Sequence, residues 1–275
     1  MVIIKIIQRG ALSTLVSVKL CADFVLACGF TLFDLPMNAN IVKEFMFHKG
    51  QILLNFTAMT RDEKIVMTDQ GLTLENGTLL PLMEEFYTIQ GEGYNTGKAA
   101  YFIRVGGCDV GCHWCDVKES WNAALHPLTP VDQIVSNAAK YPGKAVVVTG
   151  GEPSMYNLVY LTMQFALNNI KAFIETSGAY PLTGTWDWVC LSPKKTQPPL
   201  NENFFKAHEL KVVIHNKDDF KWAEKNAAMV SADCKLYLQP EWSKVKQLTD
   251  DIVEYVKNNP KWNISLQTHK YMNIP

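Results

Sequence analysis

The sequence predicts an α/β protein whose main domain is a partial, open β/α barrel. From about residue 70, short strand-like segments rich in branched and aromatic side chains alternate with segments of helical periodicity. The strands are largely apolar, which is typical of a mostly parallel sheet covered by helices. With about six or seven strands, an open barrel is favoured over a closed eight-stranded one, and a doubly wound sheet is the structural alternative.

In chain order, the expected strands are 99–105, 144–149, 171–176, 187–192, 209–215, 235–239 and 262–267. Helices are expected to begin near Thr129, Ser154, Lys217 and Trp242. The helix after Ser154 carries Leu158, Leu161 and Phe165 on one face. Because Ser154 follows a proline and its hydroxyl can accept from backbone N–H groups, we expect this serine to cap that helix.

Polar segments follow five of the strands. They are GGEP after 144–149, ETSG at the end of 171–176, SPK after 187–191, QP after 235–238 and THK after 262–267. The active sites of parallel α/β folds lie beyond the carboxyl ends of the strands. We therefore expect the glutamate, serine, lysine, glutamine and histidine side chains of these tips to line one cleft.

Residues 1–66 are predicted to be an unstructured or artefactual extension outside the fold, and residues 67–275 to form the catalytic domain. One explanation is that translation begins at Met59 or Met67 and that the preceding residues are upstream sequence. A real accessory segment is the alternative.

An export signal is a third interpretation of the extension. Residues 11–33 are apolar, but Lys19 and Asp23 interrupt them, so the longest uncharged piece is far shorter than the roughly 20 residues of a membrane span. The segment Val25–Cys28 resembles a lipoprotein export signal, and Asp23 inside the apolar region argues against one.

The composition is that of an ordinary soluble domain. The chain has 275 residues, 48% of them hydrophobic and 19% charged, and a net charge of −1. This balance does not indicate a general binder of nucleic acids or acidic membranes. The seven cysteines are not spaced as a small disulfide framework, which favours a reducing cytoplasm and free, catalytic or metal-binding thiols.

Three cysteines, Cys108, Cys112 and Cys115, lie within eight positions with the spacing C-x3-C-x2-C. Thiolates are soft ligands that suit zinc or an iron–sulfur cluster. His113 or His126 could complete a zinc site, so a zinc-binding module is one alternative. The other is a [4Fe–4S] cluster with one iron left without a protein ligand.

The remaining features of this region favour the cluster. Gly106, Gly107 and Gly111 suit a backbone that bends closely around a bulky inorganic group. Cys190 and Cys234 lie far along the chain and are expected to be small buried residues.

The cysteine motif, with Trp114 before its last cysteine, resembles the radical S-adenosylmethionine enzymes. The resemblance implies that the three cysteines hold the cluster and that the methionine part of the cofactor chelates the fourth iron. GGEP at 150–153 resembles the superfamily motif that binds the cofactor's amino group. The fold expected is therefore a partial barrel of the radical SAM type.

A longer series of motifs resembles the family of 7-carboxy-7-deazaguanine synthases, over about residues 80–275. It consists of FYTIQGEGYNTGKAAYFIRVGGC at 86–108, WCD at 114–116, TGGEP at 149–153, ETSG at 175–178, SPK at 192–194, LQP at 238–240 and the ending THKYMNIP. The resemblance implies that 6-carboxy-5,6,7,8-tetrahydropterin is converted to 7-carboxy-7-deazaguanine for 7-deazapurine and queuosine synthesis. A 5′-deoxyadenosyl radical takes hydrogen from C6, the ring contracts, hydrogen returns and ammonia leaves.

The resemblance also implies a role for individual residues. The residues expected to bind the cofactor are Trp114, Asp116, Gly151, Glu152, Ser192, Pro193, Lys194 and Gln239, with Glu152 anchoring the geometry of its strand tip. Those expected to bind the pterin are Ile89, Gln90, Gly91, Arg104, Thr149 and the terminal carboxylate of Pro275.

Two of these residues have plain alternatives. The guanidinium of Arg104 suits the pterin carboxylate because it pairs bidentately with planar anions, and a surface ion pair is the other interpretation. His269 is either a further contact or a solvated loop residue.

One position departs from the family. Threonine usually follows the CD of the cluster motif and supplies a hydroxyl to a Mg²⁺ ion that touches the substrate. This chain has Val117, which offers no oxygen. Magnesium prefers oxygen ligands and keeps waters readily. The ion is therefore either held by substrate, Asp116 and water or absent.

The enzyme alternative is a glycyl-radical activating enzyme, which would act on a protein and is not expected to carry YTIQGEG or a substrate-binding carboxyl terminus.

The partners that the resemblance implies are a small-molecule pterin, an electron donor such as flavodoxin or ferredoxin, and a second copy in a homodimer. Neither a nucleic acid nor a membrane is expected as a partner.

Overall fold

The computed structural model describes residues 3–8, 14–19, 41–48, 51–58 and 74–275. The chain divides into two units, Met1–Asp69 and Gln70–Pro275. The second unit contains all the motifs discussed above. Its first residue lies three positions after the predicted domain boundary at residue 67.

The described part of the first unit is a four-stranded antiparallel sheet. Its strands are β1 (Ile3–Gln8), β2 (Thr14–Lys19), β3 (Ile41–His48) and β4 (Gln51–Ala58), in the order β1-β2-β4-β3. For these four stretches the structure differs from the expectation of an unstructured extension. Asp23, Cys28, Met59 and Met67, on which the interpretations of the extension depend, lie outside the described residues.

The second unit is built on one nine-stranded sheet. Its strands are β5 (Leu79–Ile89), β6 (Ala99–Val105), β7 (Leu128–Pro130), β8 (Ala145–Gly150), β9 (Lys171–Thr176), β10 (Trp188–Leu191), β11 (Glu209–Ile214), β12 (Lys235–Pro240) and β13 (Trp262–Ile264). The order is β13-β12-β11-β10-β9-β8-β6-β5-β7. Because this order has two ends, the sheet is an open, partial barrel, as predicted.

Strands β6 and β8 to β13 pair in parallel, whereas β5 pairs antiparallel with both β6 and β7. All seven predicted strands are present, so the prediction of a mostly parallel sheet is confirmed. β5 and β7 were not predicted from the sequence. In β5, Glu84 and Glu85 are adjacent and are followed by Phe86 and Tyr87, which breaks the alternation of polar and apolar residues, and a shift in register between Leu82 and Glu84 interrupts its pairing.

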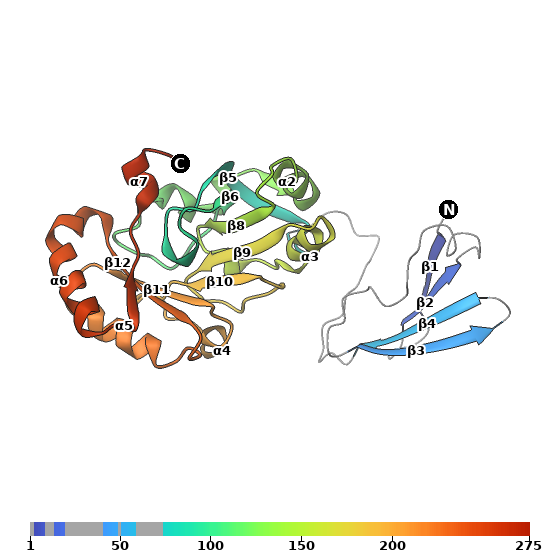
Figure 1. Cartoon of the computed structure of the whole chain (residues 1–275). Coiled ribbons are helices and arrows are strands. Elements are labelled where there is room, and N and C mark those ends of the chain that lie inside the picture. The colour runs from blue at the N-terminus through green and yellow to red at the C-terminus, as the bar shows by residue number, and fades with distance from the viewer. Residues whose placement is uncertain (1–2, 9–13, 20–40, 49–50, 59–73) are drawn as a thin grey trace. The chain divides into compact units, whose positions relative to one another are not determined.

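The helices of the second unit are α2 (Val131–Ala138), α3 (Val159–Leu167), α4 (Asn201–Phe204), α5 (Asp219–Ala227), α6 (Val245–Asn258) and α7 (Thr268–Met272). Short 3₁₀ turns lie at Gly93–Asn95, Lys118–Trp121, Ala123–Leu125, Pro153–Met155 and Trp242–Lys244. α2 packs against α3 and β7, α3 lies near β9, α5 packs near β11, and α6 packs near β12 and β13 (Figure 1). The short helices α4 and α7 were not predicted.

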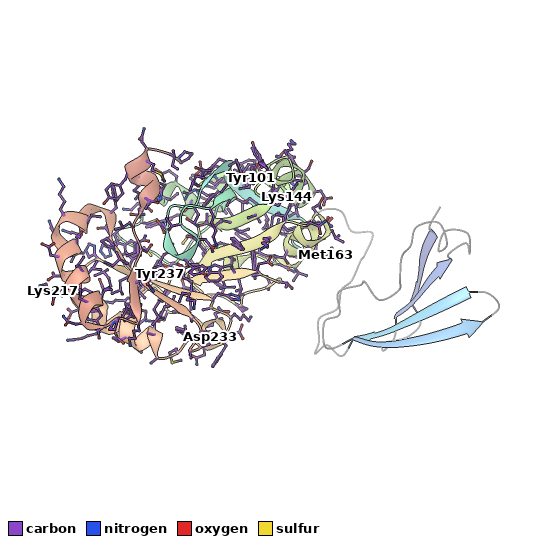
Figure 2. The ribbon with its side chains drawn as sticks, viewed as in Figure 1. Tyr101, Lys144, Met163, Lys217, Asp233 and Tyr237 are labelled. Atoms are coloured by element: carbon purple, nitrogen blue, oxygen red, sulfur yellow. The ribbon has the colours of Figure 1, made fainter. Side chains whose placement is uncertain are left out.

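The helix that follows GGEP begins later than predicted. Leu158, Leu161 and Phe165 are fully buried, as their spacing indicated, while Met163 on another face of α3 is exposed (Figure 2). Ser154 does not cap α3 but lies in the preceding 3₁₀ turn, where it donates to Glu152. The first backbone N–H of α3 instead donates to the side chain of Asn157, 3.1 Å away.

The parallel strands divide their side chains between two faces. On the outer face, residues such as Ile103, Val148, Ile174 and Val212 are fully buried in two apolar clusters that include the helices. Because side chains alternate along a strand, the intervening residues point into the barrel. Toward the carboxyl ends of the strands these inner positions become polar, and that is where the site lies.

Candidate active site

A cavity of about 510 Å³ lies at the carboxyl ends of the strands, a volume typical of sites for small molecules. Its lining includes residues from all five polar tips: Gly151, Glu152, Glu175, Ser177, Ser192, Lys194, Gln239, Pro240, His269 and Lys270. The prediction that the tips share one cleft is therefore confirmed. Every residue that the sequence analysis assigned to the site lines this cavity except Pro193, which is buried between two lining residues.

The three-cysteine loop follows β6 and is fixed by backbone hydrogen bonds. The N–H of Gly107 donates to Ser120 O at 2.6 Å, and the N–H of Cys108 donates to Trp121 O at 3.1 Å. The hydroxyl of Tyr156 donates to Gly106 O at 2.6 Å, which ties the loop to the segment before α3. Tyr156 was not among the residues predicted from the sequence.

The thiols of Cys108, Cys112 and Cys115 all line the cavity. Burial raises the pKa of Cys108 to about 11, helped by Glu152 and the neighbouring cysteines, and burial also raises the pKa of Cys112. A cationic cluster would offset this cost, because thiolates are stabilised by bound metal. The donor set of three soft thiols at the edge of a roomy cavity fits a [4Fe–4S] cluster.

A closed zinc site is not formed by these residues. Within residues 74–275 and the four described strands of the first unit, no three His, Cys, Asp or Glu side chains are grouped to hold a single metal ion. His126 instead contacts Glu119 O through Nε2 at 2.9 Å, and the His113 ring packs against His215. Cys190 and Cys234 are buried, as predicted, with Cys190 on β10 and Cys234 just before β12.

The tip of β8 lies directly against the cysteine loop. The N–H groups of Gly151 and Glu152 donate to Val105 O and Gly107 O, each at 2.8 Å. A Cβ atom at Gly151 would lie 2.1 Å from Gly107 O, so only glycine permits this approach. The glycine thus has a packing role in addition to any contact with a cofactor.

Glu152 joins the tips of β8 and β9. Its buried carboxylate accepts hydrogen bonds from the N–H and hydroxyl of Ser154, from the Thr176 hydroxyl and from the Ser177 N–H at 2.7 Å. With four protein donors, this side chain acts as a structural anchor of the site. The anchoring expected from the sequence is confirmed, and direct contact with a cofactor stays a prediction.

One wall of the cavity combines a lysine with an aromatic ring. Lys194 donates to the carbonyl and hydroxyl oxygens of Ser192 at 2.7 and 2.6 Å, and its ammonium lies 5.7 Å from the centre of the Trp114 ring. Burial lowers the pKa of Lys194. Gln239, at the end of β12, accepts from the Ser265 hydroxyl at 2.7 Å, which orients its amide.

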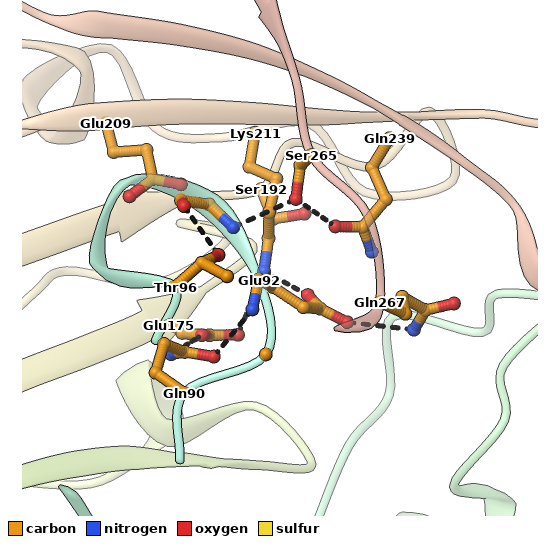
Figure 3. Close-up of polar contacts among 12 residues, drawn as sticks. Gln90, Glu92, Thr96, Glu175, Ser192, Glu209, Lys211, Gln239, Ser265 and Gln267 are labelled. Carbon is orange, nitrogen blue, oxygen red and sulfur yellow. Dashed lines mark hydrogen bonds and ion pairs between the residues drawn. The ribbon is translucent and has the colours of Figure 1, made fainter. Parts of the chain in front are cut away.

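A charged network lies on the inner face of the sheet (Figure 3). Lys211 on β11, with a side chain only 4% exposed, forms ion pairs with Glu92 and with Glu175, the latter at 3.1 Å. Gln90 donates to Glu175 at 2.9 Å, and Gln267 donates to Glu92 at 2.8 Å. Both carboxylates line the cavity, so the network presents two fixed acceptors to whatever binds there.

The ionisation states of the network follow from its charges. Burial alone would raise the pKa of Glu92, but the charge and hydrogen bond of Lys211 lower it to about 2. Burial alone would lower the pKa of Lys211, but Glu175 and Glu92 raise it well above its usual value. Burial raises the pKa of Glu209, which lies two residues before Lys211 on β11 and accepts from Trp188 Nε1 at 3.0 Å. Glu92 and Lys211 are thus charged at neutral pH.

Arg104 forms an ion pair within the protein and also faces the cavity, so both interpretations of this residue apply. Its Nε lies 2.9 Å from Glu84 Oε1 on the neighbouring strand β5, which is an ion pair. The same side chain is 24% exposed, lies over the Phe86 ring and lines the cavity beside Thr149. Glu84 therefore orients a guanidinium that still faces the site.

The carboxyl-terminal segment closes the cavity on the side of the IQGEG loop. Thr268 donates to Gly91 O through its N–H and hydroxyl at 2.9 and 3.0 Å. A Cβ atom at Gly91 would lie 2.2 Å from His269 Nδ1, so the glycine makes room for this ring. His269 is therefore not a solvated loop residue, and burial lowers its pKa. Pro275, the last residue, lines the cavity as predicted.

Several residues of the site were not predicted. Glu92, Glu175 and Lys270 stand in quoted motifs but received no individual role, and Lys211 and Gln267 were not singled out. One signal was available: Glu209 and Lys211 are charged residues at alternate positions of an otherwise apolar strand. That spacing places both on one face, and burial of a charge usually has a functional or structural cause.

The open sheet, the loop of three cavity-lining thiols and the glycine-rich tip beside it define the class of protein. The chain matches the model of the radical SAM superfamily over residues 102–190. Radical SAM enzymes bind a [4Fe–4S] cluster and S-adenosylmethionine, which is the pair of cofactors predicted from the sequence.

The chain belongs to the 7-carboxy-7-deazaguanine synthase family. It is 64% identical over 204 residues to the 7-carboxy-7-deazaguanine synthase of Flavobacterium psychrophilum, covering 74% of this chain and 97% of that enzyme. The enzyme of the same name from Synechocystis is 44% identical over 70% of this chain and 93% of its own length. The crystal structure of QueE from Escherichia coli matches with a TM-score of 0.62 and 29% identity, over 70% of this chain and 96% of that one.

These relationships confirm the enzyme predicted from the sequence and do not support the zinc-binding module or the glycyl-radical activating enzyme. The enzyme class requires a small-molecule substrate and a source of electrons. Among the described residues, no helix is long and apolar enough to cross a membrane.

Proposed function

We propose that this enzyme converts 6-carboxy-5,6,7,8-tetrahydropterin to 7-carboxy-7-deazaguanine with loss of ammonia, in the synthesis of 7-deazapurine precursors such as that of queuosine. The observation that carries the proposal is the single cavity that joins the three-cysteine loop to the network of Gln90, Glu92, Glu175 and Lys211.

The acceptors of the network match the donors of a pterin. The pyrimidinone edge of this substrate class carries an exocyclic amine and a ring N–H. Hydrogen bonds from such donors to an ionised carboxylate are stronger than those between neutral groups. Glu92 and Glu175 therefore suit this edge, because Lys211 holds them in place and keeps Glu92 ionised.

The negatively charged carboxylate of the substrate would face Arg104 on another wall of the cavity. Arg104 pairs well with a planar carboxylate, and Glu84 holds its Nε side. The terminal carboxylate of Pro275 offers a further acceptor along the same cavity, which Ile89 and Gly91 also line. This arrangement would orient a carboxylated bicyclic ring with one edge on the glutamates.

The cofactors bind on the side of the cysteine loop in this proposal. When bound, the reduced cluster and S-adenosylmethionine supply a 5′-deoxyadenosyl radical that removes hydrogen from C6 of the pterin. Ser192, Lys194 and Gln239 hold the polar parts of S-adenosylmethionine, and Trp114 covers one side of it. The anchored carboxylate of Glu152 keeps the β8 tip at a fixed position beside the cluster loop.

The finer predictions about partners belong to this proposal too. We expect a flavodoxin or ferredoxin as electron donor, a homodimer and a cytoplasmic location. The spacing of the seven cysteines, which is not that of a disulfide framework, supports the cytoplasmic location.

The test is an anaerobic assay of the purified, brown enzyme with 6-carboxytetrahydropterin, S-adenosylmethionine and dithionite. We expect 7-carboxy-7-deazaguanine and ammonia in equal amounts, with S-adenosylmethionine regenerated. A matched reaction with tetrahydropterin that lacks the carboxylate should give little product, because Arg104 then has no substrate carboxylate to bind. Cleavage of S-adenosylmethionine without any change in the pterin would contradict the proposal.

A further inference from the structure

The carboxylate next to the cysteine motif is already paired with a cation of this chain. Lys270 Nζ lies 2.8 Å from Asp116 Oδ2, and both residues line the cavity. The Lys270 side chain is 21% exposed, and that of Asp116 is 57% exposed. The contact joins the first residue after Cys115 to the helix near the carboxyl terminus.

The position of this ammonium is fixed from several sides. α7 is tied to the IQGEG loop through Thr268 and Gly91, and the N–H of Lys270 donates to Gln267 O at 3.0 Å. The ammonium also lies 4.9 Å from the centre of the Trp242 ring, within the range of a cation–π interaction. The helix, the aromatic ring and the carboxylate together hold Lys270 in a defined position in the site.

The residues at positions 116 and 117 do not fit the magnesium ion that the family resemblance implies. Magnesium takes six oxygen ligands in octahedral geometry. Val117 offers a hydrocarbon side chain where the family offers a hydroxyl. Asp116, the remaining oxygen donor, is engaged by Lys270. A divalent ion would find one protein ligand there, and the charge of that ligand is already neutralised.

We propose that Lys270 takes the place of the divalent cation in this enzyme: its ammonium neutralises Asp116 and donates to an anionic oxygen of the carboxylated pterin. The proposal rests on the proposed function and adds that substrate binding and turnover need no magnesium. A fixed ammonium supplies one positive charge and up to three donors, which suits a single carboxylate or carbonyl oxygen.

The test measures pterin binding calorimetrically with the S-adenosylmethionine-loaded holoenzyme, after chelation and again with added Mg²⁺, together with turnover. Wild type should bind equally well in both conditions, within twofold. Lys270→Met keeps the apolar stem but loses the charge, and should bind about tenfold or more weakly after chelation. Lys270→Gln should behave in the same way. The matched control is Lys118→Met, since the exposed Lys118 lies over Trp121 and does not line the cavity.

A double variant tests whether Mg²⁺ can replace the ammonium of Lys270. In Lys270→Met combined with Val117→Thr, added Mg²⁺ should restore most of the lost affinity, because a hydroxyl and an unpaired Asp116 are then available. A wild type that binds pterin only with Mg²⁺, or a Lys270→Met variant indistinguishable from Lys118→Met, would overturn this proposal alone. Absence of pterin binding by wild type in both conditions would overturn the proposed function and this proposal with it.

Discussion

The ammonium of Lys211 lies 3.1 Å from the carboxylate of Glu175 inside the barrel. Lys211 is on β11 and Glu175 is on β9, and β10 lies between these two strands. The same ammonium holds Glu92 from the IQGEG loop. One buried lysine thus fixes the loop and the sheet relative to each other. Two carboxylates that are distant in sequence thus form a single acceptor surface of the cavity.

Replacing Lys211 by methionine should disable this surface. The change leaves Glu92 and Glu175 buried without their cation, and breaking a buried ion pair in this way costs about 3–5 kcal/mol. We expect a lower midpoint in anaerobic urea unfolding and a KM for pterin raised at least tenfold. The matched control, Lys217→Met, removes a lysine whose partner Asp251 is on the surface and should change stability by about 0.5 kcal/mol or less. Equal effects of the two variants would contradict the assignment.

Acid should weaken the same pairing in a defined pH range. The pKa of Glu92 is lowered from 4.5 to about 2, so its contribution to stability is present above about pH 4.5 and is lost as the pH falls toward 2. The stability difference between wild type and Glu92→Gln, measured on the cluster-free proteins by urea unfolding, should be constant from pH 7 to 5. It should shrink below pH 4.5. A difference that grows in acid would show that Glu92 is not ionised in the folded state.

The cysteines of the loop should be separable from the buried ones. Cys108→Ala, Cys112→Ala and Cys115→Ala should each abolish the brown colour and the activity, while far-ultraviolet circular dichroism stays unchanged. Cys190→Ala is the control, because Cys190 is buried on β10 outside the cavity that the loop lines. Loss of iron from the Cys190 variant would show that the ligands are misassigned.

The last residue offers a test of the substrate wall. A tag added after Pro275, or removal of Pro275, should weaken pterin binding, because the terminal carboxylate in the cavity is displaced. The affinity for S-adenosylmethionine and the iron content should stay normal. A tag at the amino terminus is the control and should change neither affinity. Equal pterin affinity of the two tagged forms would show that the terminus does not bind substrate.

The first unit should be dispensable for catalysis. The 204 residues that align with 97% of the Flavobacterium psychrophilum enzyme correspond in length to the second unit, Gln70–Pro275. A chain that begins at Met59 should therefore keep the iron content, kcat and KM of the full chain. An insoluble or inactive product would mean that residues before Met59 support the catalytic fold.

The sequence by itself determined which strand side chains face the helices and where the tips of the strands lie. The apolar face of each parallel strand is set by period-two alternation, as at Ile103, Val105 and Val212, and burial of such residues needs no knowledge of distant partners. The tips could also be located, because parallel strands bring their carboxyl ends together whatever their order along the sheet. The three-cysteine spacing is local, so its chemistry was readable as well.

Only the tertiary structure decided which polar groups meet inside the barrel. Lys211 and Glu92 are 119 residues apart, and Lys270 and Asp116 are 154 residues apart, so no local pattern pairs them. Their ionisation depends on burial and on the charge that faces them, and both are products of packing. For the same reason, the sequence shows a valine at position 117, but only the fold shows that the ammonium of Lys270 lies beside Asp116.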